Sequence, residues 1–213
     1  MSPLLLLADS QLLFRPDQLP QLLRHCTGQE RSAAKPQSAA YIGAANGNRP
    51  EFFDLARSAL ATLFGQPVPC HFIQSESDIP PGPCALVILA GGSVETGWAF
   101  LQQQPVRDWL ETCRSEADAV FIGVSAGAIH LASGCGPEQP SPRAQTYLGW
   151  APLFVAVHEE GENWPTARIW REAKSLQASG SLTFAGVPMG GGLWLDDGGC
   201  EPVGRSGPLF YKP

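Results

Sequence analysis

Residues 119–132 read Ala-Val-Phe-Ile-Gly-Val-Ser-Ala-Gly-Ala-Ile-His-Leu-Ala, and the central run Gly123-Val124-Ser125-Ala126-Gly127 decides the fold. The apolar run before it predicts a buried strand, and the small residues after it predict a helix. A G-x-S-x-G pattern between a strand and a helix is typical of a nucleophile elbow, a tight turn that lifts a serine hydroxyl clear of the sheet. Glycine fits positions 123 and 127 because any Cβ there would crowd the turn. The run therefore predicts an α/β protein in which Ser125 is a nucleophile.

Short apolar runs alternate with helical patterns through the first 125 residues. Strands are predicted at residues 4–8, 39–43, 68–73, 85–89 and 119–122, and helices at 19–26, 50–63, 94–101 and 106–117. This alternation predicts a mostly parallel sheet with helices on both faces, as in flavodoxin-like proteins. Short runs at 182–185, 192–195, 200–203 and 209–211, separated by Gly-rich turns, predict antiparallel strands appended to that sheet. We expect a single α/β domain over residues 1–213, because no repeat or linker divides the chain.

Composition narrows the class of protein. The chain of 213 residues is 44% hydrophobic and 16% charged, which indicates a compact globular protein. Its net charge of −6, with no basic cluster, argues against nucleic acid and anionic membranes as partners. No apolar stretch reaches the roughly 18 residues of a membrane span, and Asp9 interrupts the N-terminal apolar run too early for a signal peptide. We therefore expect a cytoplasmic protein whose six cysteines, which form no C-x-x-C pair, are buried thiols.

Three features fall at predicted strand ends: Asn46-Gly47, Gly91-Gly92 and Ser125. In a parallel sheet these ends share one edge, where ligands bind. Asn46 and Gly91 are therefore predicted to contact substrate. The backbone N–H of Ala126 is placed to donate to an oxyanion, and a glycine N–H of the Gly91-Gly92 pair could supply a second donor.

A serine nucleophile needs a base, which is usually histidine. His25 lies in a predicted helix, His71 lies inside a predicted strand, and His130 is too far round the helix that follows Ser125. His158 ends the apolar run 153–157 and so lies at a strand terminus. Elimination and position both favour His158 as the base.

A third group should orient the imidazole and stabilise its cation. Glu160 lies two residues after the histidine, and Glu138 lies in the segment between the elbow and the histidine. The sequence leaves both candidates open. No cluster of His, Cys, Asp and Glu has the spacing of a metal site, so we expect neither a metal nor a cofactor.

These motifs together resemble the serine peptidase family that includes aspartyl dipeptidase (peptidase E) and, more distantly, cyanophycinase. The resemblance rests on residues 41–47, 89–92, 123–128, 148–158 and 186–190, which in order and spacing cover most of the chain. It implies a fold like that of class I glutamine amidotransferases, with serine replacing their cysteine nucleophile. It also implies that Ser125 attacks a peptide carbonyl, with His158 as base and Gly92 and Ala126 as oxyanion donors. Known members of the family favour an acidic or modified aspartyl residue at the cleaved bond.

The chain departs from the family pattern after the elbow, where Glu138 matches the third triad carboxylate only loosely. An acidic substrate would also need cations. Arg168, with Arg171 and Arg143, could supply a bidentate clamp for a substrate carboxylate.

The sequence thus predicts a serine hydrolase that cleaves a short peptide next to an aspartyl or other acidic residue through an acyl-enzyme on Ser125. One alternative is a cyanophycinase-like or other amidohydrolase that acts on an aspartyl-linked substrate. Another is a binding or scaffold protein that has kept the fold without turnover, because a fold alone does not confer activity. The expected partner is a small peptide or amide, and a homodimer is an assembly to test.

Overall fold

Two sheets and five α-helices make up the part of the chain that the computed structural model describes, which is residues 2–27, 38–135, 147–158, 183–204 and 209–211. The strands are β1 (Leu4–Leu7), β2 (Ala39–Ile42), β3 (Cys70–Ile73), β4 (Leu86–Leu89), β5 (Val120–Val124), β6 (Ala132–Cys135), β7 (Ala151–Val157), β8 (Thr183–Val187), β9 (Gly191–Asp196), β10 (Gly199–Gly204) and β11 (Leu209–Tyr211). The α-helices are α1 (Pro20–Thr27), α2 (Pro50–Phe64), α3 (Val94–Leu101), α4 (Gln104–Glu116) and α5 (Ala126–Leu131). Short 3₁₀ turns are η1 (Gln11–Phe14), η2 (Pro16–Gln18), η3 (Ala44–Asn46) and η4 (Glu76–Asp78).

The main sheet has seven strands in the order β10-β9-β1-β5-β4-β2-β3. The five strands from β1 to β3 in that order run parallel to one another. β9 is antiparallel to β1, and β10 is antiparallel to β9. The predicted mostly parallel sheet with antiparallel C-terminal strands is confirmed.

A second sheet of four strands, in the order β11-β8-β7-β6, differs from the prediction. β7 pairs in parallel with both β6 and β8, and β11 runs antiparallel to β8. We expected all four C-terminal runs to extend the main sheet, which is correct for β9 and β10 and wrong for β8 and β11. Apolar alternation shows that a segment is a strand, but it does not show which sheet edge the strand will join, because pairing depends on contacts far along the chain.

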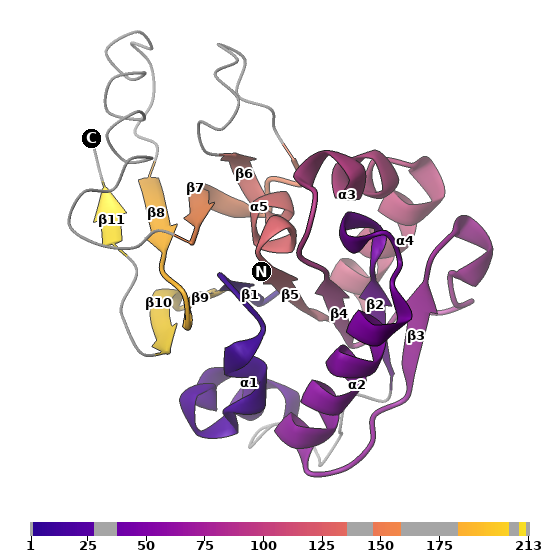
Figure 1. The fold of residues 1–213 in the computed structure, drawn as a ribbon, viewed down its shortest axis with the longest axis horizontal. Coiled ribbons are helices and arrows are strands. Elements are labelled where there is room, and N and C mark those ends of the chain that lie inside the picture. Colours follow the sequence, from indigo (N-terminus) through magenta and orange to yellow (C-terminus); the bar gives the residue numbers. More distant parts are fainter. Residues whose placement is uncertain (1, 28–37, 136–146, 159–182, 205–208, 212–213) are drawn as a thin grey trace, which may run out of the picture.

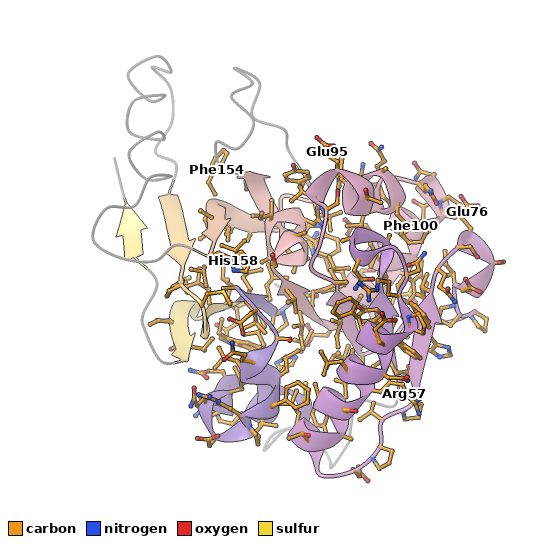
Figure 2. The ribbon with its side chains drawn as sticks, viewed as in Figure 1. Arg57, Glu76, Glu95, Phe100, Phe154 and His158 are labelled. Carbon is orange, nitrogen blue, oxygen red and sulfur yellow. The ribbon has the colours of Figure 1, made fainter. Side chains whose placement is uncertain are left out.

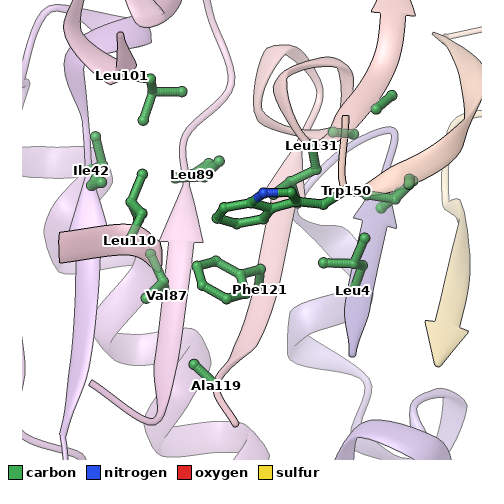
Figure 3. Packing of buried hydrophobic residues seen from close by; sticks show 14 of the residues in the cluster. Leu4, Ile42, Val87, Leu89, Leu101, Leu110, Ala119, Phe121, Leu131 and Trp150 are labelled. Carbon is green, nitrogen blue, oxygen red and sulfur yellow. The ribbon is translucent and has the colours of Figure 1, made fainter. Parts of the chain in front are cut away.

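Alternate side chains of the main sheet enter two separate cores. Leu4 and Leu6 point to the face covered by α3, α4, α5 and the second sheet, whereas Leu5 and Leu7 point to the face covered by α1 and α2. The two helix groups lie on opposite sides of the sheet (Figure 1). On the first face the ring of Phe121 packs edge-on against Trp150 at 4.7 Å between ring centroids (Figure 3). Both faces are buried, which explains why these strands read as continuous apolar runs.

The carboxyl ends of the central strands meet at one edge. The Ser125 N–H donates to the Leu7 carbonyl at 2.8 Å, so the end of β5 lies beside the end of β1. The loop after β4 packs on the loop after β2, where the Ser93 N–H donates to the Ala45 carbonyl at 2.8 Å. Gly92 lies between these loops at φ +133°, and a Cβ there would collide with the Ala45 carbonyl. Asn46, Gly91 and Ser125 consequently occupy the same edge of the sheet.

Candidate active site

Ser125 lies on a sharp turn between β5 and α5 with φ 51° and ψ −110°. This combination is unfavourable for a residue with a Cβ, and such outliers cluster at functional sites. The turn needs the flanking glycines: a Cβ at Gly123 would lie 2.5 Å from the Gly127 backbone, and one at Gly127 would collide with the Leu89 carbonyl. The half-buried serine is thus held at the strand end with its side chain turned away from the strand ladder.

His158 comes from the second sheet, directly after β7 (Figure 2). Its backbone is also left-handed, at φ 62°. Its exposed imidazole faces the elbow, and Nε2 lies 2.9 Å from Ser125 Oγ. The structure therefore brings together the two residues that the sequence assigns as nucleophile and base, although they belong to different sheets.

The other imidazole nitrogen of His158, Nδ1, faces the thioether of Met189 at 2.7 Å. Met189 lies in the turn between β8 and β9. That turn is fixed by Asp9, whose carboxylate accepts from the Gly190 N–H at 2.6 Å and from the Gln11 N–H at 2.7 Å. A thioether is only a weak acceptor, so Met189 can hold the ring in place but stabilises an imidazolium less than a carboxylate would.

Met189 was missed as a contact of the candidate base. The available signal is its position: the Pro-Met-Gly-Gly turn follows a strand that runs parallel to β7, so it ends at the same edge as His158. Glu138 and Glu160, the sequence candidates for this position, lie outside the described residues, as do Arg168, Arg171 and Arg143.

Two backbone regions flank the nucleophile. Ala126 is the first residue of α5, so its N–H has no acceptor within the helix. On the other side, an added Cβ on Gly91 would lie only 3.2 Å from the Ser125 Cβ, so the loop after β4 packs directly against the serine. Gly92 follows in the same loop. That Gly92 and Ala126 donate to an oxyanion stays a prediction.

A cavity of about 310 Å³ opens beside this loop. Its walls come from the turn after β1, the β2 and β4 ends, and α2, with these residues: Ser10, Leu13, Phe14, Tyr41, Asn46, Phe52, Leu55, Ala56, Ala59, Ile88, Ala90, Gly91, Gly92 and Val124. Asn46 lies in this wall, where its Nδ2 donates to the Tyr41 hydroxyl at 2.7 Å. Burial raises the pKa of Tyr41, although the Asn46 hydrogen bond opposes the shift, so this hydroxyl stays neutral near pH 7.

His130 has a packing role. It is 1% exposed, and its Nε2 donates to the Val94 carbonyl at 2.8 Å. Burial lowers its pKa, although the Val94 bond opposes the shift, so the ring is held neutral.

The prediction of buried thiols is correct for Cys84 and Cys113 but wrong for Cys200, which is exposed because β10 is an edge strand with most of its side chains in solvent.

Two general findings concern the described part of the chain. It contains no group of three or more His, Cys, Asp or Glu residues that could hold a metal ion. Nor does any of its helices have the length and apolarity to cross a membrane.

Solved structures share this architecture. A peptidase from an acI-B1 Actinobacterium has a TM-score of 0.67 at 16% identity, over 97% of this chain and 88% of that one. A candidate peptidase E protein from Listeria monocytogenes EGD-e has a TM-score of 0.59 at 13% identity, over 97% of this chain and 100% of that one. The chain has a peptidase E-like fold. No family model matches the sequence, and no curated protein matches it either.

The likeness is one of fold, since both identities are below 20%. In this peptidase E-like fold the candidate site spans both sheets: the main sheet contributes Ser125, and the second sheet contributes His158.

Proposed function

We propose that this protein is a serine peptidase in which Ser125 forms an acyl-enzyme and His158 is the base. The 2.9 Å approach of Ser125 Oγ to His158 Nε2, at a strained strand-to-helix turn, carries the proposal. A hydroxyl in contact with an imidazole can lose its proton as it attacks a carbonyl. The two fold neighbours described as peptidases are in keeping with this chemistry.

The reaction would run in two halves. Oγ attacks the carbonyl carbon of the peptide bond while its proton moves to Nε2, which requires the tautomer with hydrogen on Nδ1, directed at the Met189 sulfur. The N–H groups of Ala126 and Gly92 would donate to the tetrahedral oxyanion, and each such donor lowers the barrier by about 3 kcal/mol. Collapse of this intermediate releases the amine, which takes the proton from Nε2. Water then hydrolyses the ester through the same steps.

A non-catalytic member of the fold is the second candidate, and one observation favours it. The thioether of Met189 occupies the place at Nδ1 where a carboxylate would support an imidazolium. The preference for an aspartyl or acidic residue at the cleaved bond, like an amidohydrolase activity on aspartyl-linked substrates, stays a prediction from the family resemblance.

Labelling with a fluorophosphonate probe, followed by peptide mapping, tests the proposal. We expect one equivalent of probe on Ser125 and none on Ser125→Ala. Ser58→Ala, which changes an exposed serine of α2, is the matched control and should label like the parent. His158→Ala should label far more slowly, because nucleophile and base act as a unit. Absence of labelling in the folded parent would favour the non-catalytic candidate.

A further inference from the structure

We infer that the cavity beside Ser125 binds a hydrophobic side chain of the substrate, so that the enzyme prefers an aromatic or branched aliphatic residue next to the cleaved bond over an acidic one. This inference rests on the serine peptidase function proposed above. It names the substrate class of that same site, and it differs from the acidic preference that the family resemblance implies.

The cavity reaches the residues that lie next to the candidate nucleophile. Gly91, Gly92 and Val124 form its inner wall, and Val124 directly precedes Ser125. Gly91 packs against the serine so closely that one added carbon would lie 3.2 Å from the Ser125 Cβ. A peptide whose carbonyl carbon lay on Oγ would therefore have an adjacent side chain within reach of this cavity.

The outer wall holds apolar side chains that the fold leaves in water. Phe14, Phe52 and Leu55 are 37%, 39% and 41% exposed, and all three line the cavity. The fourth large apolar side chain with comparable exposure in the described residues is Met189, at 40%, which touches His158. Exposed apolar groups gathered around a pocket mark a ligand site more than a chance surface. Here three of the four line the cavity, and the fourth touches the candidate base.

The charge of the cavity also favours an apolar side chain over an acidic one, because the described wall contains no Lys, Arg or His. One cation at the rim is Arg49, whose guanidinium lies 5.2 Å from the Phe52 ring centroid. Its side chain is 60% exposed, and its Nε donates to the Glu51 carboxylate at 2.7 Å, so its charge is already paired. A substrate carboxylate in the cavity would lose water without gaining a cation from the described wall, which is strongly unfavourable.

The volume suits one side chain. A cavity of about 310 Å³ is roughly twice the 150 Å³ that admits benzene, so it holds a Phe or Leu side chain with room for part of its backbone. Two polar side chains of the wall are paired: Asn46 Nδ2 donates to the Tyr41 hydroxyl at 2.7 Å, and Asn46 Oδ1 accepts from the Arg49 backbone N–H at 3.4 Å. The cavity thus has the size and the apolar surface to bind one hydrophobic side chain.

A dipeptide panel tests the preference on both sides of the bond. The substrates are Phe-Ala, Leu-Ala and Asp-Ala, with the reversed set Ala-Phe, Ala-Leu and Ala-Asp, and released amino acids are quantified. We expect kcat/KM for the Phe and Leu members of one set to exceed that of the Asp member by at least about tenfold. Leu55→Arg, at an exposed position of α2, should reverse that order by adding a cation to the wall. Arg49→Gln is the matched control and should leave the order unchanged.

A second measurement separates this inference from the proposed function. Methanesulfonyl fluoride and phenylmethanesulfonyl fluoride both sulfonylate a reactive serine with loss of fluoride, but only the second has a ring for the cavity. The ratio of the two inactivation rates, phenyl reagent over methyl reagent, should fall about tenfold in Leu55→Arg relative to the parent. The methyl reagent should inactivate the parent and Leu55→Arg at similar rates. Comparing this ratio between the parent and Leu55→Arg cancels the difference in intrinsic reactivity between the two reagents.

The outcomes are distinct. If the methyl reagent labels Ser125 but the Asp peptides are cleaved best, or if the rate ratio is unchanged by Leu55→Arg, the hydrophobic preference is refuted and the serine chemistry stands. If neither reagent nor peptide reacts with the folded parent, the proposed function itself fails.

Discussion

The backbone at Ser125 predicts that replacing the nucleophile with glycine gives a more stable protein than replacing it with alanine, although both variants lose turnover. At φ 51° and ψ −110° a Cβ is strained, and such strain amounts to about 1–3 kcal/mol. Ser125→Ala keeps the Cβ and its strain, whereas Ser125→Gly relieves it. Both variants lose the contact with His158, so their difference isolates the backbone term.

The magnitude follows from two opposing effects. Relief of about 2 kcal/mol of strain is offset by about 0.8 kcal/mol, because glycine has more freedom in the unfolded chain. Ser125→Gly should therefore be more stable than Ser125→Ala by about 1 kcal/mol, which corresponds to about 2–4 °C in Tm for a chain of this size.

Thermal and urea denaturation followed by circular dichroism measure this difference. Ser58 supplies a control of opposite sign, because it lies in the regular, exposed part of α2. There the glycine variant should be less stable than the alanine variant by about 0.8–1 kcal/mol. If Ser125→Gly proved less stable than Ser125→Ala, the turn would not be strained by the Cβ, and the reasoning would be refuted.

Three further predictions concern the surroundings of the site. Gly91→Ala should lower kcat at least about tenfold, since its methyl would crowd the Ser125 Cβ at 3.2 Å, while Gly82→Ala, where no atom lies within 4 Å, should not change kcat. Met189→Glu should raise kcat at least about tenfold by giving His158 a carboxylate partner at Nδ1. The isosteric Met189→Leu should leave kcat unchanged. Equal rates for the two variants would contradict the idea that the residue at position 189 supports the base. Burial lowers the pKa of His130, so at acidic pH the unfolded state binds a proton that the native state does not. The contribution of His130 to the free energy of unfolding is therefore complete above about pH 6.5 and falls at lower pH by up to about 1.4 kcal/mol per pH unit. Urea midpoints between pH 5 and 8 should show this slope in the parent and a flatter one in His130→Gln; equal slopes would rule out His130 as its source.

The sequence by itself determined the parallel α/β architecture and the elbow. Both depend on local rules: apolar runs with flanking turns give strands, 3.6-residue periodicity gives helices, and the small residues around Ser125 permit only one kind of turn. The position of His158 at a strand end was also readable, because it directly follows an apolar run.

Only the tertiary structure decided which side chains meet at the carboxyl edge of the main sheet. Ser125 and His158 are separated by 33 residues and lie after strands of two different sheets, and hydrophobic patterns carry no information about which sheet a strand joins. The cavity likewise combines side chains of η1 and α2, two elements that are distant in the chain. A pattern shows that a side chain avoids water; which side chains remain partly exposed beside the nucleophile depends on how distant elements pack, so that feature is absent from any local stretch of sequence.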